Sequence, residues 1–401
     1  MAIDPSSGGP CRFCGTELRH TFVDLGMSPL CESFLAEEQL NELERFYPLH
    51  AYVCHECHLV QLQEYVSPEE IFSEYAYFSS YSSSWLEHAQ QYCLAITDRL
   101  DLGPDSLVVE LASNDGYLLK NFVEAGIPVL GIEPAKNVAE VAREKGVPTR
   151  AEFFGEAYAE ELARDGLRAD LVIGNNVLAQ VPDLNSFVAG ISILLEPDGV
   201  VTLEFPHLIR TIQGNQFDQV YHEHFSYFSL VTVEKIFARH GLEVFDIEPL
   251  RTHGGSLRVF GKRRGPATHR VSDAVGRVRQ QEIDAGLLEM DTYAAFSEKV
   301  KETKRNLVAF LIEARRAGSS VAAYGAPGKG NTLLNYCGIR TDLLDYCVDR
   351  NPYKHGRYTP GTHIPIFDPS RLEETRPDTI LIRPWNLKDE IVAAMNGIGD
   401  W

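Results

Sequence analysis

Basic residues and long apolar runs are both scarce in this sequence. Its 37 Lys and Arg residues face 57 Asp and Glu residues, so the formal net charge is −20. Binding to nucleic acid or anionic lipid depends on neutralising phosphates with basic side chains, so this charge balance argues against both partners. No apolar run approaches the roughly 18 residues that cross a membrane, and residues 1–9 lack a basic segment followed by an apolar one. We therefore expect a cytoplasmic protein that binds neither nucleic acid nor membrane.

The cysteines show no sign of a disulfide framework. Four of the eight form two Cys-x-x-Cys pairs: Cys11, Cys14, Cys54 and Cys57. In a chain without an export signal, such paired motifs predict a tetrahedral structural zinc site with four thiolate ligands. Iron would use the same ligands, and His55 or His58 could replace a thiolate, so both alternatives stay open. The other four cysteines are expected to be small core residues.

A polar turn between two apolar segments is the central feature of the chain. Residues 107–111 are largely apolar, residues 113–116 form the turn, and an amphipathic segment follows. A second strand at residues 129–132 leads to Glu133, about 20 residues after the turn, where βαβ nucleotide-binding folds bind a ribose. Because the turn lacks G-x-G-x-x-G, it is not shaped for a pyrophosphate. We expect an adenosine ligand without phosphates, most commonly S-adenosylmethionine; an ordinary βα turn is the alternative.

This turn resembles motif I of class I methyltransferases, with Ala112 and Asn114 at positions where many members carry glycine. A third strand is expected to end at residues 150–154, and Asp198 and Gly199 are expected to form a turn before a fifth strand. The strand between them, at residues 170–176, has a polar end, which belongs at the carboxyl edge where open α/β sheets bind ligands. Residues 243–247 and 256–260 predict an antiparallel pair that closes five parallel strands, as in the class I, Rossmann-like sheet. The residues expected to bind the cofactor are Glu110, Ser113, Asn114, Asp115, Gly116, Glu133, Pro134, Phe153, Asn175 and Asn176.

Residues 221–228 place two imidazoles, a carboxylate and several aromatic rings in one short segment. In a class I sheet, a segment between the fifth strand and the antiparallel pair lies over the methyl donor. The spacing of His222 and His224 would also suit a metal site, and buried histidines at the start of a helix are a further alternative. We favour general acid/base chemistry for this segment. Residues 74–85, rich in tyrosine and serine, form either a capped loop or a lid over a polar ligand.

The C-terminal part contains a second strand-turn-helix pattern. A long helical stretch with a break near Gly286 leads to residues 320–332, which carry three glycines in an order that differs from G-x-G-x-x-G. Residues 343–349 and 378–382 are expected to follow as strands. With Lys329 and the downstream Asp349, this turn could receive a diphosphate on its backbone N–H groups; a purely structural turn is an equal alternative.

The sequence thus predicts three α/β parts in the 401 residues. They are a zinc-binding module at residues 1–66, a central class I methyltransferase domain at residues 67–264, and a second Rossmann-like α/β domain at residues 265–401.

Several motifs in the same order resemble one family. They are the paired Cys-x-x-Cys motifs and residues 110–117, 175–182, 221–224, 253–258 and 324–331, so the resemblance spans nearly the whole chain. They are similar to the sugar C-methyltransferases of deoxysugar biosynthesis, which methylate a carbon beside the 4-keto group of a thymidine-diphosphate (dTDP) deoxysugar. The most similar branch acts at C3 of a 3-amino-2,3,6-trideoxy-4-keto hexose, on the way to the nitrosugar tetronitrose. Methylation at C5 or C3 of a non-amino sugar, or of another class of substrate, is the alternative.

The resemblance also implies site residues. The expected catalytic residues are Tyr75, Gln180, Tyr221, Glu223 and His224, and the expected substrate-binding residues are Tyr77, Ser80, His253, Arg258, Lys329 and Asn331. His224 is the best candidate for the base, because imidazole titrates near neutral pH, while Glu223 or Tyr221 would orient it or donate to the developing oxyanion. No catalytic metal is required. The family usually has histidine where this chain has Gln180, so this position offers no titratable group. A monomer is compatible with the sequence.

Overall fold

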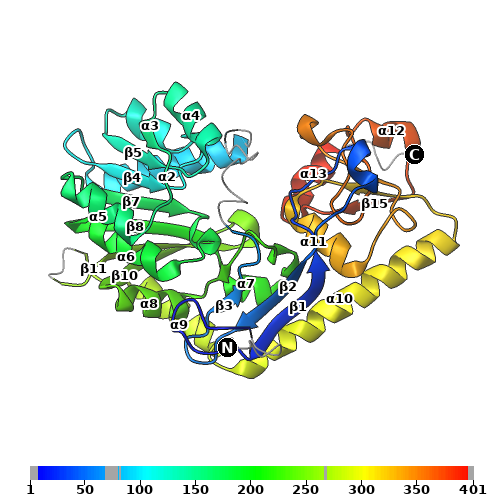
Figure 1. The fold of residues 1–401 in the computed structure, drawn as a ribbon, viewed down its shortest axis with the longest axis horizontal. Coiled ribbons are helices and arrows are strands. Elements are labelled where there is room, and N and C mark those ends of the chain that lie inside the picture. The colour runs from blue at the N-terminus through cyan, green and yellow to red at the C-terminus, as the bar shows by residue number, and fades with distance from the viewer. Residues whose placement is uncertain (1–7, 68–79, 81–82, 266–268, 396–401) are drawn as a thin grey trace. The chain divides into compact units, whose positions relative to one another are not determined.

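The structure is a computed structural model that describes residues 8–67, 80, 83–265 and 269–395 (Figure 1). The chain folds into two compact units, each built from separate segments. Unit 1 comprises Met1–Leu18, Cys54–Ile209 and Phe225–Leu288, and unit 2 comprises Arg19–Val53, Arg210–His224 and Glu289–Trp401. The domain boundaries that the sequence predicts near residues 66 and 264 stay a prediction.

A seven-stranded sheet forms the centre of unit 1. Its strands lie in the order β10 (Leu242–Leu250), β11 (Ser256–Arg263), β8 (Leu195–Pro206), β7 (Ala169–Asn175), β4 (Val108–Leu111), β5 (Val129–Ile132) and β6 (Thr149–Arg150). The strands from β8 to β6 are parallel to one another, and β11 and β10 close the sheet in antiparallel fashion. This arrangement confirms the predicted class I sheet.

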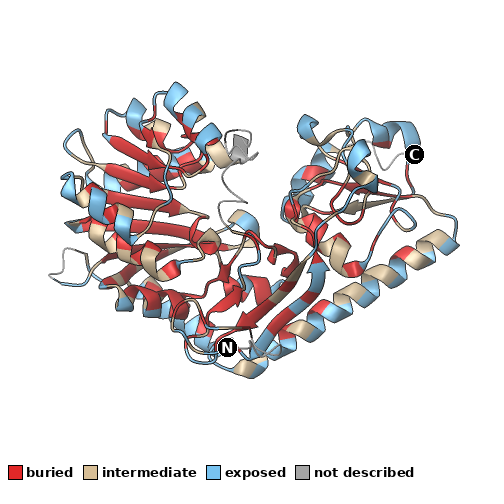
Figure 2. Cartoon of the chain, viewed as in Figure 1, coloured by how far each residue is buried: buried red, intermediate tan, exposed pale blue. Residues whose placement is uncertain are grey.

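The central strands are buried on both faces, as their apolar composition predicts (Figure 2). Glycine is required at one point of this core. A Cβ on Gly131 of β5 would lie 2.5 Å from Ser113 Oγ and 2.9 Å from Thr149 Oγ1. The missing side chain therefore lets the turn after β4 approach the neighbouring strand closely.

The helices of unit 1 follow the strands in the α/β alternation that the sequence predicts. They are α2 (Ser83–Leu100), α3 (Leu119–Glu124), α4 (Lys136–Glu144), α5 (Glu156–Arg164), η3 (Leu178–Gln180), α6 (Leu184–Leu194), α8 (Leu230–Arg239), η5 (Thr252–Gly254) and α9 (Asp273–Asp284). Two have side-chain caps: Asp183 accepts a hydrogen bond from Ser186 N at the start of α6, and Ser229 accepts one from Thr232 N at the start of α8. The strands β3 (Val60–Leu62) and β9 (Ser226–Tyr227) pair antiparallel, and α7 (Leu208–Gln213) spans the division between the units.

Two details of the sheet differ from the sequence prediction. The third strand was expected to continue to Phe154, but β6 ends at Arg150, because this edge strand pairs with β5 only at Thr149 and Arg150. A turn was expected at Asp198 and Gly199 before the fifth strand. The structure instead incorporates these residues in β8, where the pairing with β7 shifts register.

Unit 2 contains a four-stranded parallel sheet in the order β14-β13-β12-β15. Its strands are β12 (Val321–Tyr324), β13 (Tyr346–Val348), β14 (Ile366–Phe367) and β15 (Thr379–Ile382). Its helices are η1 (Glu37–Asn41), η4 (Phe217–Gln219), α10 (Met290–Arg316), α11 (Gly328–Cys337), η6 (Pro352–Lys354), α12 (Arg371–Thr375), η7 (Trp385–Leu387) and α13 (Lys388–Ala394). This sheet confirms a second Rossmann-like α/β fold, and only the short β14 was not foreseen.

The break in the long helical stretch is confirmed, since Gly286 has a φ of 78° and separates α9 from α10. The antiparallel strands β1 (His20–Ser28) and β2 (Tyr47–Val53) also belong to unit 2. Phe22 of β1 stacks on Phe296 of α10 with ring centroids 4.5 Å apart and meets Tyr293 edge-on at 6.1 Å. These contacts join the N-terminal hairpin to the C-terminal residues of the same unit. Within the described part of the chain, every helix is too short or too polar to cross a membrane.

Candidate functional site

The turn after β4 has the backbone of a glycine-rich turn, although only the last of its three left-handed residues is glycine. Ala112, Asn114 and Gly116 have φ values of 54°, 50° and 75°. Asn visits this left-handed region more readily than Ala, whose strain there is of the order of 1–2 kcal/mol. Glycine is needed at the last position for space as well, because a Cβ on Gly116 would lie 2.9 Å from Val147 Cγ2. The two substitutions noted against motif I therefore preserve the conformation of the turn.

Glu133 holds this turn in place. Its carboxylate accepts hydrogen bonds from Asn114 N and Ala135 N, both at 2.9 Å. Burial raises the pKa of Glu133, and burial together with the charges of Glu133 and Asp115 raises the pKa of Glu110. Asp115 pairs with Lys145 at 2.8 Å. A surplus of carboxylates thus surrounds the turn, which favours a cationic ligand.

The polar oxygens at the carboxyl edge of the sheet provide a test of whether an adenosyl cofactor fits. Five buried side-chain oxygens have no hydrogen-bond partner among the described residues: Glu110 Oε2, Ser113 Oγ, Asp115 Oδ1, Asn175 Oδ1 and Asn176 Oδ1. Buried polar groups are almost always hydrogen-bonded in proteins, to protein, water or ligand, so a ligand that brings several donors would satisfy these oxygens. The ribose hydroxyls and the ammonium group of S-adenosylmethionine are such donors, and its positive charge suits the acidic surroundings. Phe153, which lies beyond β6, is 42% exposed and leaves a ring face available for an adenine.

We expect Glu133→Gln to weaken S-adenosylmethionine binding by roughly 1–3 kcal/mol, or about 5–150-fold in Kd. The amide has one acceptor oxygen where the carboxylate has two, so one of the two backbone N–H groups loses its partner. The substitution also removes the negative charge that the carboxylate offers to the ligand. Calorimetric titration measures the effect. Glu140→Gln, an exposed change on α4, is the matched control, and equal affinity in the two variants would remove Glu133 from the cofactor site.

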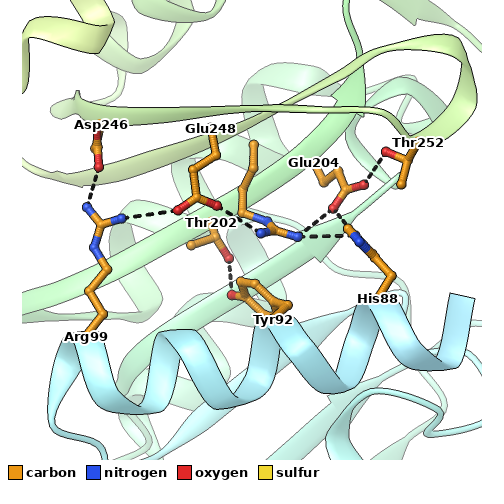
Figure 3. Close-up of polar contacts among 9 residues, drawn as sticks. His88, Tyr92, Arg99, Thr202, Glu204, Asp246, Glu248 and Thr252 are labelled. Atoms are coloured by element: carbon orange, nitrogen blue, oxygen red, sulfur yellow. Dashed lines mark hydrogen bonds and ion pairs between the residues drawn. The ribbon is translucent and has the colours of Figure 1, made fainter.

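A network of ion pairs fixes α2 against the strands beside this edge (Figure 3). Arg258 of β11 contacts Glu204 of β8 and Glu248 of β10, each at 3.0 Å, and also approaches His88 Nε2 at 3.2 Å. Glu204 further accepts hydrogen bonds from His88 at 3.0 Å and from Thr252 at 2.8 Å. Arg258 was expected to bind substrate, but its side chain is 6% exposed and its guanidinium is engaged within the unit.

Contacts of α2 with the strands extend beyond Arg258, since Arg99 also lies 3.5 Å from Glu248. Arg99 pairs with Asp246 at 2.5 Å, and Tyr92 shares a hydrogen bond of 2.6 Å with Thr202. Glu204 lies opposite Asn175 in the sheet, and its carbonyl accepts from Asn176 N at 2.7 Å. The network therefore connects the placement of α2 to the strand end that carries the two asparagines. His253, in the left-handed region with a φ of 53°, places its ring edge-on to Trp85 at 5.5 Å.

Glu204→Gln should lower the free energy of unfolding by about 1–3 kcal/mol at neutral pH, because it weakens charge-assisted hydrogen bonds in a buried site. Burial raises the pKa of Glu204, but the hydrogen bond from His88 and the charge of Arg258 outweigh burial and hold the pKa below its usual 4.5. A lowered folded-state pKa means that the carboxylate stabilises the fold above pH 4.5 and that this contribution is lost as pH falls further. Urea unfolding at neutral and acidic pH should therefore show the difference from the parent shrinking in acid. Glu243→Gln, on a half-exposed side chain of β10, is the control, and a pH-independent difference would contradict the explanation.

In unit 2, the segment at residues 221–224 aims its two imidazoles at different partners. His224 Nδ1 lies 3.1 Å from the carbonyl oxygen of Gln219, and its Nε2 lies 2.9 Å from the hydroxyl of Tyr221. A carbonyl can only accept, so Nδ1 carries the hydrogen of the neutral ring and Nε2 is the basic nitrogen. The Tyr221 hydroxyl therefore donates to Nε2. This geometry is suited to taking up a proton through the Tyr221 oxygen.

His222 has a different environment. Its Nε2 lies 3.2 Å from the carbonyl oxygen of Pro48, and burial lowers the pKa of the ring, which favours its neutral form. Glu223 is also buried and accepts a hydrogen bond from the Cys31 thiol at 3.7 Å. Among the described residues, the His222 and His224 pair is not part of any group with three potential metal ligands. The structure thus gives no support to the metal-site alternative for this segment.

Carboxylates already occupy the glycine-rich turn before α11. Asp349 accepts from Ala326 N at 2.6 Å, and a Cβ on Gly328 would lie 2.6 Å from Glu32 Oε1. Glu32 also accepts a hydrogen bond from the Gly328 backbone at the start of α11. The negative groups take up N–H groups that a diphosphate would need, which favours the structural alternative for the turn itself.

The cation beside this turn is half-buried and lies close to aromatic and acidic groups. Lys329 Nζ lies 4.3 Å from the centroid of the Trp385 ring and donates to Asn386 Oδ1. Burial lowers the pKa of Lys329, and the charge of Asp218 opposes this effect. Asn331 is 1% exposed and donates to the carbonyl oxygen of Cys31 at 2.7 Å, so its amide is engaged within the fold.

The four predicted metal ligands come together in unit 1. The sulfur atoms of Cys11, Cys14, Cys54 and Cys57 all lie within 4.8 Å of one another, with Cys11–Cys57 at 3.6 Å and Cys14–Cys54 at 3.5 Å. Four thiolates at about 2.3 Å from a tetrahedral zinc ion lie about 3.8 Å apart, so the cluster fits this metal. Neither His55 nor His58 belongs to the cluster. All four ligands are thiols, which leaves no open position for a catalytic water.

The remaining site predictions divide between described and undescribed residues. Tyr75 and Tyr77 lie outside the described residues. Ser80 is described and accepts a hydrogen bond from Lys145 at 2.9 Å, which links it to Asp115 of the cofactor turn. Gln180 lies in η3, after the asparagines of β7. Sequence reasoning missed Cys31, Gln219 and Glu204, whose partners are distant in the chain or involve the backbone, and no local motif marks them.

Known proteins resemble the chain in three consecutive regions and along almost its whole length. Family models match a zinc binding domain at residues 11–72, a methyltransferase domain at residues 85–247, and a C-methyltransferase C-terminal domain at residues 251–401. The C-methyltransferase NovU of Streptomyces niveus is 37% identical over 95% of this chain and 91% of its own length. The ubiquinone biosynthesis O-methyltransferase of Bartonella bacilliformis is 25% identical over 28% of this chain and 47% of its own length. Among solved structures, magnesium protoporphyrin IX methyltransferase from Synechocystis PCC 6803 is 17% identical, with a TM-score of 0.34 over 45% of this chain and 81% of that chain.

Proposed function

Since the chain belongs to the family of S-adenosylmethionine-dependent C-methyltransferases with an N-terminal zinc-binding domain, we propose that it methylates a carbon beside the keto group of a dTDP-linked 4-keto deoxysugar. The proposed position is C3 of a 3-amino-2,3,6-trideoxy-4-keto hexose. The resemblance of motifs along the chain supports this class of substrate, and the acidic net charge of −20 disfavours a nucleic acid.

The chemistry requires a carbon nucleophile. A carbon next to a ketone becomes nucleophilic only after it loses a proton, so the enzyme must supply a base. The observation that carries the proposal is the arrangement of Tyr221, His224 and the Gln219 carbonyl, because it fixes the basic nitrogen of the ring against a hydroxyl. As the Tyr221 oxygen takes the proton from the sugar carbon, Tyr221 passes its own proton to His224 Nε2. The Gln219 carbonyl stabilises the resulting imidazolium through Nδ1–H.

The cofactor supplies an electrophilic methyl group when it is bound. In the proposed site, Glu133 holds the turn and would accept hydrogen bonds from the ribose hydroxyls, and Asn175 and Asn176 would offer acceptors at the carboxyl edge of the sheet. Glu110 and Asp115 would offer carboxyl oxygens to the cationic groups of the cofactor, whose positive charge would oppose the raised pKa of Glu110. These residues orient the donor and take no part in proton transfer.

We propose that the ammonium group of Lys329 binds the diphosphate of the sugar nucleotide as an ion-pair partner. Its ammonium is held against Trp385 and near Asp218, so it is positioned before any ligand arrives. We do not assign this role to the backbone of the glycine-rich turn, because Glu32 and Asp349 already contact it.

A panel of dTDP 4-keto sugars incubated with trideuteromethyl S-adenosylmethionine tests the proposal. We expect mass spectrometry to show one labelled methyl group on the 3-amino-2,3,6-trideoxy-4-keto sugar, and NMR to place it at C3. A label at C5 would change the assigned position of methylation, and a label only on a non-amino sugar would change the assigned substrate. Both results would keep the substrate within the dTDP 4-keto sugars. If no 4-keto sugar were labelled by protein that binds the cofactor, the substrate class would be wrong.

A further inference from the structure

Arg12 lies between two metal-binding cysteines, yet its side chain contacts other parts of unit 1. Its Nη1 donates to the carbonyl oxygen of Pro182 at 2.9 Å, and its Nη2 donates to that of Leu62. The guanidinium carbon also lies 5.5 Å from the centroid of the Phe225 ring. One side chain of the zinc-binding module thus links β3, the segment after η3 and the residue before β9.

The segments that Arg12 links are also bonded to one another. Phe225 N donates to the carbonyl oxygen of Ala179 at 2.7 Å, and Leu62 N donates to that of Phe225 at 3.0 Å. Together with the two bonds from Arg12 and the backbone of residues 179–182, they form a closed loop of contacts. Phe225 follows His224 directly in the chain, and residues 177–182 follow the asparagines at the end of β7. Both segments therefore lead into residues that the proposed reaction uses.

The cysteine cluster determines where Arg12 lies. Arg12 N donates to Gln61 Oε1 at 2.9 Å, while Gln61 Nε2 donates to Cys11 Sγ at 3.1 Å. On the other side, Asn185 Nδ2 donates to the Arg12 carbonyl oxygen at 3.0 Å. The backbone of Arg12 is thus fixed between a metal-binding sulfur and the start of α6, and its side chain has little freedom to reach other partners.

We propose that Arg12 is a positioning residue for the methyl transfer, through which the zinc-binding module holds residues 177–182 and Phe225 in place. The guanidinium presents its N–H groups as a planar fork, which allows two carbonyls of different segments to be bound at once. A lysine has the same charge on a single nitrogen and lacks this fork. The module therefore acts on turnover in addition to stabilising the fold.

The test compares Arg12→Gln and Arg12→Lys with Arg19→Gln, an exposed arginine shortly after the same Cys-x-x-Cys pair. In both Arg12 variants we expect one zinc equivalent to remain and S-adenosylmethionine affinity to stay within about threefold of the parent. Backbone amides at residues 177–183 should exchange with deuterium at least tenfold faster. The kcat should fall about 10–100-fold, with KM changed much less, since a displacement of about 1 Å can slow a reaction by 10²-fold.

The exchange and zinc measurements require no sugar substrate, whereas the kcat effect rests on the proposed function. If the proposed sugar were not a substrate, the hydrogen-exchange measurement would still test the role of Arg12 independently. Unchanged exchange in both Arg12 variants would overturn the proposal. Loss of zinc from Arg12→Lys would also overturn it, because Arg12 would then stabilise the metal module itself. If Arg12→Gln failed to fold, Arg12→Lys, which keeps the buried charge, would decide the outcome.

Discussion

Turnover should fall by roughly 10²–10⁴-fold when His224 is replaced by Asn, the range that general-base catalysis typically contributes. The amide preserves much of the size of the ring and can still donate to the Gln219 carbonyl, but it has no basic nitrogen for the Tyr221 hydroxyl. Binding of S-adenosylmethionine, which we propose takes place on residues of unit 1, should remain within about threefold. Steady-state kinetics and calorimetric titration measure the two effects separately.

Hydrogen exchange into the sugar separates a base from a residue that merely binds. With the cofactor product S-adenosylhomocysteine bound, the parent should exchange the proton beside the keto group in deuterium oxide, and His224→Asn should not. Tyr221→Phe should also lose exchange if its oxygen takes the proton first, whereas retained exchange would mean that His224 takes it directly. His20→Asn, an exposed change in the same unit, is the control. Exchange in His224→Asn at the parental rate would exclude His224 as the base.

The second large effect concerns the metal. Cys57→Ser should release the single bound zinc ion and lower the free energy of unfolding by several kcal/mol, because structural zinc contributes about 10–16 kcal/mol of binding free energy in small peptide sites. Three thiolates and a hydroxyl no longer match the preference of zinc for four sulfur ligands. Elemental analysis and thermal unfolding measure both changes.

Replacing a buried thiol has a cost of its own, which a control must remove. Cys337→Ser changes a buried cysteine of unit 2 that lies outside the cluster, so it should keep the metal and lose only about 1–3 kcal/mol. Equal losses in the two variants, or full zinc content in Cys57→Ser, would contradict the assignment. If elemental analysis found iron in the native protein, the four cysteine ligands would stay assigned and only the identity of the metal would change.

The elements that sequence predicted well are those set by local pattern. The strand leading to Glu133, the turn at residues 113–116 and the antiparallel closing pair each have apolar periodicity and turn residues that act over short stretches. The two Cys-x-x-Cys pairs were equally clear, because four thiols with this spacing have few other uses in a chain without disulfides.

Features set by distant partners could not be predicted in this way. Arg258 appeared to be an available cation, yet strands β8 and β10 provide the carboxylates that bury it. The glycine-rich turn appeared open to a diphosphate, but Glu32 reaches it from the other end of the chain. The difference between His222 and His224 depends on backbone carbonyls, and a sequence does not show which carbonyls a ring will meet.

The discontinuous make-up of the two units has a consequence for how the protein is made. Strands β1 and β2 leave the ribosome early, but Tyr293 and Phe296, which cover Phe22, are synthesised only after all of unit 1. Until then, this hairpin has an apolar face without its native cover, and exposed strands of that kind are prone to mispairing during folding. Unit 1 can complete its seven-stranded sheet once β11 has emerged. The metal cluster then fixes Cys54, the residue that directly follows the hairpin. We therefore expect the seven-stranded sheet of unit 1 to fold first in nascent chains. The N-terminal hairpin can pack only after the C-terminal third of the chain has been synthesised.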